Sequence, residues 1–170
     1  LLGTMVLSAF DSFSERFDGL QRSRRALALL SRHVDIDLAL FEGVRVVEAT
    51  EHDPNGPLDA QVALRDQATD YRSLVPQLNP RHVDSPTPPE RSDDSQARVV
   101  LGEAALQRLV ADYPDRLATL LATDALQLRA VDDDTLPFHL SIADGPDGPA
   151  VGVLVYDGPE PRAWLANDTD

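Results

Sequence analysis

The order of strand-like and helix-like segments is the feature that most constrains this sequence. Residues 44–48, 73–76 and 97–101 are short runs rich in valine and leucine, which is typical of β-strands. Between the first two, apolar residues recur at helical spacing from Pro57 to about Tyr71. This β-α-β order predicts an α/β fold, in which a small mixed β-sheet is covered by flanking helices.

The second half of the chain continues this alternation. Gly102 begins a helix that ends near Pro114, residues 115–123 form further helical turns, and residues 126–131 alternate like a strand. Residues 138–142 and 151–156 are predicted to form an antiparallel pair at an edge of the sheet, joined by a turn at residues 144–148.

Residues 84–96 contain three prolines and no large apolar side chain, so we expect a flexible loop there.

The beginning of the chain predicts a long amphipathic helix. Its apolar side chains alternate at spacings of four and three residues, which is the pattern of a heptad seam: Val6, Phe10, Phe13, Phe17 and Leu20. Two interpretations are open. The helix lies on its own domain and buries the seam there, or it is a linker and dimerisation helix that pairs with a second copy of the chain. We adopt the second for residues 1–33, with residues 34–170 as an effector or output domain.

The charged residues indicate the solvent in which the chain works. The sequence has no lysine; its 15 basic residues are all arginine, its acidic residues are 22 aspartates and 7 glutamates, and its net charge is −14. The negative charges repel one another, and a folded chain tolerates this repulsion where salt screens it, since the Debye length falls to about 3 Å at about 1 M salt. We therefore expect a cytoplasmic protein of a halophile that accumulates salt. The acidic balance also argues against DNA binding by this chain alone, because phosphate contacts need clustered basic residues.

No group of residues predicts catalysis, a metal, a cofactor or a membrane span. Without cysteine there is no thiolate chemistry and no cysteine-based zinc site, and without lysine there is no Schiff base and no P-loop. The histidines show no ligand-pair spacing, and residues 132–134 lack the pattern of a calcium loop. No apolar run approaches the roughly 20 residues of a membrane-spanning helix. We therefore do not expect an enzyme.

A small-molecule pocket is expected between the sheet edge and a helix. The candidate ligand-binding residues are Tyr71, Arg72, Arg129, Phe138, His139 and Tyr156. Arg72 and Arg129 are of most interest, because a buried arginine needs an anionic partner. The alternative for each residue is an ordinary role in the core or at the sheet edge; for His139 it is that of a packed strand residue.

In order and spacing, these segments resemble the effector half of archaeal winged-helix transcription regulators. The stretches that carry the resemblance are AFDSFSERFDGLQRS, LALFEGVRVVEAT, LRDQATDYRSLVPQLNPRHVD, VVLGEAALQRLVADYPDRLATLLAT, LQLRAVDDDTLPFHLSIADG, and VGVLVYD with PRAWLANDTD. They are similar to the middle domain of methanogenesis regulatory proteins, also called the methanogen output domain, which is abundant in haloarchaea. That region is similar in layout to a phospholipase-D-like α/β half, whose catalysis needs a lysine that this chain lacks.

The resemblance implies that an N-terminal winged helix-turn-helix is missing from this chain, and that DNA is bound only through it. It also implies a C-terminal helix after residues 167–170, which match a helix N-cap. From the heptad seam we expect a homodimer, and we hypothesise that a small-molecule effector or a partner shifts the domain between two arrangements. Residues 84–96 depart from the family, in which a continuous helix leads into a strand. The alternative function is a stand-alone interaction or remnant protein without DNA-binding activity.

Overall fold

The computed structural model describes residue 28 and residues 44–136 and 138–167. The helix predicted for residues 1–33, with its heptad seam, therefore lies outside the described residues. The C-terminal helix expected after residues 167–170 is likewise outside them.

The described residues form one mixed β-sheet of seven strands, in the order β1-β7-β6-β5-β2-β3-β4. The strands are β1 (Arg45–Glu48), β2 (Asp70–Val75), β3 (Gln96–Gly102), β4 (Leu126–Val131), β5 (His139–Gly145), β6 (Gly148–Asp157) and β7 (Glu160–Asn167). β2, β3 and β4 run parallel to one another, and the other neighbouring pairs are antiparallel. The strands predicted near β1, β3 and β4 are confirmed, as is the mixed sheet.

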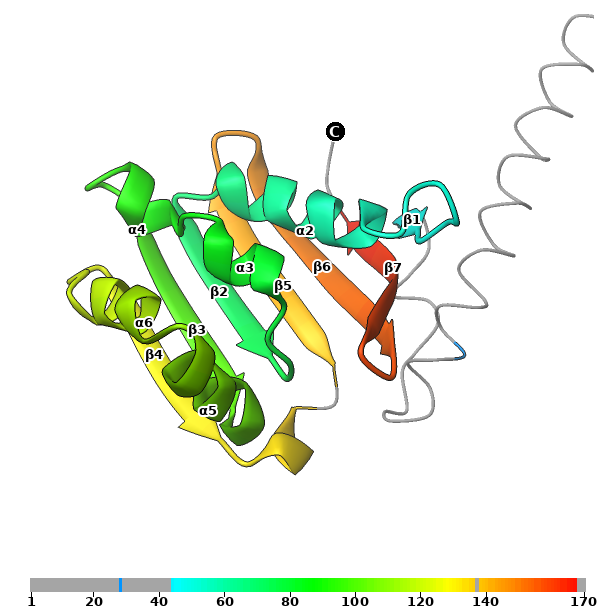
Figure 1. Cartoon of the computed structure of the whole chain (residues 1–170). Helices are drawn as coiled ribbons and strands as arrows, with labels where there is room; N and C mark the ends of the chain where they lie inside the picture. Colours follow the sequence, from blue (N-terminus) through cyan, green and yellow to red (C-terminus); the bar gives the residue numbers. More distant parts are fainter. Residues whose placement is uncertain (1–27, 29–43, 137, 168–170) are drawn as a thin grey trace, which may run out of the picture.

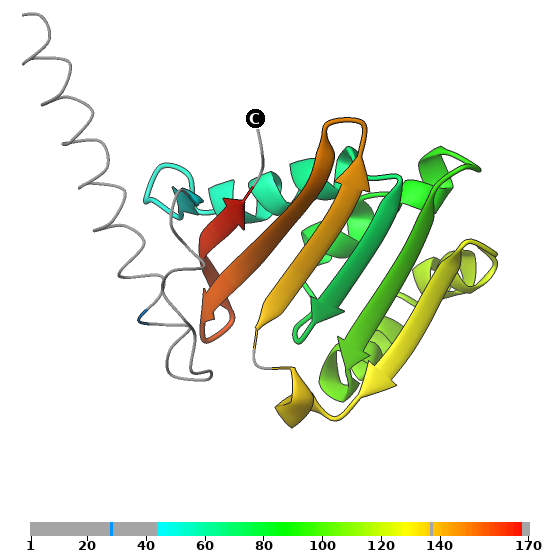
Figure 2. The same cartoon turned by 180° about the vertical axis from the view of Figure 1, so that it is seen from behind.

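The helices that follow β1 lie on one face of this sheet. They are α2 (Gly56–Asp66), α3 (Pro80–Asp84), α4 (Pro88–Arg91), α5 (Glu103–Asp112) and α6 (Pro114–Leu121), with a 3-10 turn, η2, at Asp133–Thr135. They are in front of the strands in Figure 1, and the strands are in front of them in the reverse view of Figure 2. α2 packs against β5, β6 and β7, whereas α5 and α6 pack against β3 and β4. The predicted α/β class with flanking helices is confirmed.

The apolar core lies between the sheet and these helices. Leu58 of α2 and Trp164 of β7 are fully buried there. A second cluster of buried side chains alternates with Trp164 along the strands and therefore lies on the opposite face of β6 and β7: Val155, Ala163 and Leu165.

The prediction that the first helix extends to Tyr71 is wrong. α2 ends at Asp66, and Tyr71 belongs to β2. The backbone of Thr69 is already engaged in the sheet, because its N–H donates to Asp144 and its carbonyl accepts from the N–H of Gln96. Pairing with two neighbouring strands therefore overrides the helical spacing in this segment.

The antiparallel pair predicted for residues 138–142 and 151–156 is confirmed as β5 and β6, but its position at the sheet edge is wrong. β7 pairs with β6, and β1 lies outside β7. The sequence does not reveal β7 as a half-buried strand, because four consecutive residues, 163–166, are buried and no alternation is visible.

The segment at residues 84–96 contains α4 instead of loop alone. Thr87 and Glu90 form a capping box, and Pro88 and Pro89 are buried at its first positions. The prolines that indicated a loop thus begin a short helix. The predicted flexibility of the segment stays a prediction.

Trp164 packs directly on the backbone of β6 at Gly152, where a β-carbon would overlap the indole ring. We predict that Gly152→Ala lowers the free energy of unfolding by about 2 kcal/mol or more, because an overpacked core must shift to admit the methyl group. Chemical denaturation measures the change. In a double-mutant cycle, Trp164→Leu should make Gly152→Ala much less costly; strictly additive effects would contradict the contact.

Candidate functional site

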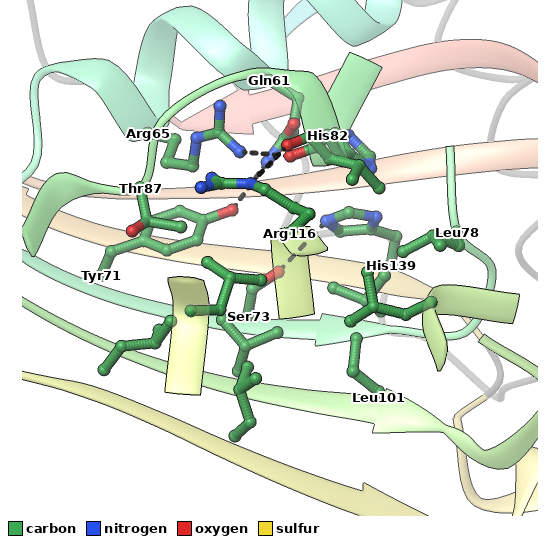
Figure 3. Close-up of a pocket in the computed structure, with 17 residues that line it drawn as sticks. Gln61, Arg65, Tyr71, Ser73, Leu78, His82, Thr87, Leu101, Arg116 and His139 are labelled. Carbon is green, nitrogen blue, oxygen red and sulfur yellow. Dashed lines mark hydrogen bonds between the residues drawn. The ribbon is translucent and has the colours of Figure 1, made fainter. Parts of the chain in front are cut away.

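A pocket of about 80 Å³ lies between the helix-facing side of the sheet and the helices (Figure 3). Its polar side chains come from α2, α3, α6 and the strands β2 and β5, and its apolar wall comes mainly from β3, β4, α5 and α6. The volume is several times the roughly 10–15 Å³ that one water needs. The pocket can therefore hold a molecule of a few non-hydrogen atoms.

A buried hydrogen-bond network forms the floor of this pocket. The Gln61 side-chain amide donates to the Tyr71 hydroxyl at 2.6 Å and to Ser141 Oγ at 3.2 Å, and the Tyr71 and Ser141 hydroxyls are 2.9 Å apart. Burial is the main cause that raises the pKa of Tyr71, which therefore stays a neutral phenol. The hydroxyls of Tyr71 and Ser141 and the amide nitrogen of Gln61 are thus paired within the core, whereas the buried Oε1 of Gln61 has no hydrogen-bond partner.

Ser73 and His139 form the second part of the network. Ser73 Oγ lies 3.1 Å from His139 Nε2 and donates its own proton to the Leu140 carbonyl at 2.9 Å. Because a hydroxyl has one proton, His139 must be the donor to Ser73, and its buried Nδ1 is left as an acceptor without a partner. A serine–histidine pair of this polarity is the reverse of a nucleophile and its base, in which the serine donates to the histidine.

Arg65 brings a buried positive charge to the pocket. It is only 4% exposed, and Nη1 donates to the His82 carbonyl at 3.3 Å. Nε lies 3.8 Å from the Asp66 carboxylate, which Arg91 approaches more closely, at 2.5 Å. Nε and Nη2 have no hydrogen-bond partner. Burial lowers the pKa of Arg65, but a guanidinium remains charged in proteins, so the charge of Arg65 is poorly compensated.

Two neutral histidines lie near this guanidinium. The rings of His82 and His139 are 5.0 Å apart. Burial, followed by the charge of Arg65, lowers the pKa of His82 to about 3. Burial is also the main cause that lowers the pKa of His139 well below its usual value, with His82 and Arg65 acting in the same direction. Arg65 is therefore the positively charged group among these three side chains.

Arg116 also lines the pocket, but its charge is neutralised. Its guanidinium forms an ion pair with Glu90 and donates to the carbonyls of Val83 at 2.8 Å and Ser85 at 3.2 Å. The hydrogen bond from Arg116 is the main cause that lowers the pKa of Glu90 to about 2, and Thr87 acts in the same direction. These contacts tie the α3–α4 segment to α6 beside the pocket.

The structure brings together two of the six predicted ligand-binding residues, Tyr71 and His139, and places the others outside the lining of this pocket. Arg72 is exposed and pairs with Asp70 at 2.9 Å, and Arg129 is exposed on β4. Phe138 packs beside the second apolar cluster, and the buried Tyr156 hydroxyl has no partner. Ligand binding by any of the six stays a prediction.

Sequence reasoning missed the polar residues that α2 contributes. Gln61 and Arg65 are one helical turn apart and lie on the same buried face as Leu58. A polar pair at this spacing within an apolar stripe was a usable signal. His82 and Arg116 had no such local signal, because the loops and helices that carry them meet only in the folded chain.

Within the described part of the chain, no cluster of three or more histidine, aspartate or glutamate side chains could hold a metal ion. No helix among the same residues is long and apolar enough to cross a membrane.

A protein-family model described as the middle domain of the methanogenesis regulatory protein FilR1 matches residues 54–170, which include every pocket residue discussed above. The chain belongs to this family. No curated protein matches the chain significantly.

Among solved structures, the chain is similar to that of TrmBL2, described as an archaeal chromatin protein with a novel mode of DNA binding. The match covers 98% of this chain and 61% of the TrmBL2 chain, with 16% sequence identity and a TM-score of 0.50. At this identity, the likeness shows a shared fold.

The neutral buried histidines make the stability of this FilR1-family domain depend on pH. The unfolded chain binds protons near the ordinary histidine pKa of 6.5, but folded His82 does so only near 3. Stability is therefore full above the unfolded value and decreases as the pH falls toward the folded one. We predict that His82→Phe, which keeps a buried ring without a titrating group, reduces the slope of unfolding free energy against pH by about 1 kcal/mol per unit between about pH 4 and 6.

Denaturation curves at several pH values measure this slope. His52→Gln, at an exposed histidine, is the matched control and should leave the slope as it is in the unmodified chain. A His82→Phe variant that keeps the original slope would show that His82 is not held neutral by the fold.

Proposed function

We propose that this chain is the effector and dimerisation part of a haloarchaeal, DNA-binding transcriptional regulator. The observation that carries the proposal is the match of residues 54–170 to the middle domain of a methanogenesis regulatory protein. The likeness to an archaeal DNA-binding chromatin protein supports it at the level of fold. The lysine-free, strongly acidic composition supports a salt-rich archaeal cytoplasm.

The pocket fits an effector role better than a catalytic one. The hydroxyl of Ser73 is committed to a backbone carbonyl, and His139 Nδ1 lacks the carboxylate partner that orients a catalytic histidine. The strongest unpaired hydrogen-bond donor of the pocket is the guanidinium of Arg65, which can bind a ligand but is not a nucleophile. We therefore infer a site that binds a small molecule without converting it.

We propose that DNA is contacted by a winged helix-turn-helix in a segment joined to this one. The present chain has a net charge of −14, which opposes contact with phosphates. A regulator with two such domains can read two half-sites if its protomers are held at a fixed spacing. The heptad seam of residues 6–20 would supply that pairing.

The seam predicts the oligomeric state. We expect the chain to have twice the mass of one copy in about 3 M KCl, where its charges are screened, and the double variant Phe13→Asp, Phe17→Asp to be monomeric. Light scattering makes the measurement. Leu121→Asp, at a leucine that is 67% exposed, is a matched control that should stay dimeric. A monomeric original chain would favour a helix that lies on its own domain.

The DNA-binding proposal is tested by the coding sequence beside this one. We predict an in-frame winged helix there, and that the joined polypeptide binds DNA fragments from its own promoter region while the present chain does not. Fluorescence anisotropy at constant salt compares the two. If no such segment exists and neither protein binds DNA, the stand-alone interaction protein becomes the better account.

A further inference from the structure

We propose that the pocket beside Arg65 binds a short aliphatic hydroxy acid, with the carboxylate at the guanidinium of Arg65 and the hydroxyl at His139. The regulatory meaning of this ligand rests on the function proposed above, whereas the binding itself does not. The pocket lies among Gln61, Arg65, His82, His139 and the apolar side chains of the α5–α6 side (Figure 3).

The carboxylate is inferred from the unused donors of Arg65. Nε and Nη2 are both buried and without hydrogen-bond partners, and these two nitrogens lie on one edge of the planar guanidinium. That edge matches the two oxygens of a carboxylate, which accept parallel, charge-assisted hydrogen bonds. The nearest anion, Asp66, is 3.8 Å from Nε and is also paired with Arg91, so it does not fill this role.

The hydroxyl is inferred from an unused acceptor. Since His139 donates from Nε2 to Ser73, its Nδ1 is an acceptor, and it is buried without a partner. Leaving such a group unsatisfied costs about 1–3 kcal/mol, which a ligand hydroxyl can recover. The carboxylate alone would leave this acceptor unpaired.

The short aliphatic body follows from the size and walls of the pocket. At about 80 Å³, the pocket admits only a few non-hydrogen atoms. Its far wall consists of aliphatic side chains, among them Leu101, Leu109 and Leu128. A second charged group on the ligand would be buried against this wall without a partner, which is costly. The geometry therefore favours a monocarboxylate over a polyanion.

Three commercial probes separate these features. We predict that 2-hydroxybutyrate binds at least tenfold more tightly than 1,2-butanediol, which lacks the carboxylate, and several-fold more tightly than butyrate, which lacks the hydroxyl. Isothermal titration calorimetry on the full chain measures the three affinities. The chloride concentration is kept constant, because chloride is itself an anion that competes for Arg65.

Variants then locate the site. Arg65→Gln should weaken 2-hydroxybutyrate binding at least tenfold and abolish the preference for the acid over the diol. Arg72→Gln changes the net charge equally at an exposed arginine outside the pocket, and it should bind like the original chain. Equal weakening by both variants would mean that the acid responds only to overall charge, and the proposal would be wrong.

A measurement on the unmodified chain covers the case in which Arg65→Gln does not fold. In ¹⁵N NMR spectra, 2-hydroxybutyrate should shift the Arg65 Nε–H and His139 ring signals and leave the Arg72 Nε–H signal in place. No shift at millimolar ligand, or equal binding of acid and diol, would overturn the ligand class. Either result leaves the DNA-binding test untouched, since binding here is measured without DNA.

Discussion

The pairing of β2 with β5 is the contact on which the rest of the structure depends. β2 is parallel to β3 on one side and antiparallel to β5 on the other, so it joins the two halves of the sheet. The register sets Ser73 directly opposite Ser141, on the face that the helices cover. Polar side chains from both halves therefore meet in the middle of an otherwise apolar layer. Because they are shut off from water there, they must bond to one another, to Gln61, or to a ligand.

The two arginines of the pocket show how differently the fold treats the same side chain. Arg116 has a carboxylate and two backbone carbonyls within hydrogen-bond distance, and its charge holds α4 and the chain before it against α6. Arg65 is more deeply buried and has one carbonyl contact. A lysine at this position could lose its proton on burial, but a guanidinium keeps its charge. Every basic residue of this chain is an arginine, so a buried basic residue keeps its positive charge and is stabilised by a nearby anion.

Local sequence pattern is sufficient for elements whose own residues show a clear periodicity, and insufficient where pairing with distant strands decides the structure. β3 follows from a short run of branched apolar residues and β4 from alternation, and α5 begins at Glu103, one residue after the predicted Gly102. The pattern does not reveal β7 because four consecutive residues of this strand are buried, and it predicts a helix at residue 71 because the strand partners of this residue lie far away in sequence. The candidate site also depends on contacts between residues that are distant in sequence. His139 was identified as a candidate from its polarity within a strand, but its relation to Arg65 and His82 depends on three separate elements meeting, which no local spacing encodes.

A signal from the pocket has a short physical path to the beginning of the domain. Arg65 is on α2, and α2 packs against β1 and β7 as well as against the pocket. β1 begins at Arg45, close to the N-terminal segment for which we propose a pairing helix. A ligand shifts a conformational equilibrium only by the difference in its affinity for the two states. An anion at Nε and Nη2 of Arg65 would leave the existing bond from α2 to the His82 carbonyl in place and add a further tie between α2 and β5. It would therefore favour the state in which α2 is fixed on the sheet, and β1 with it.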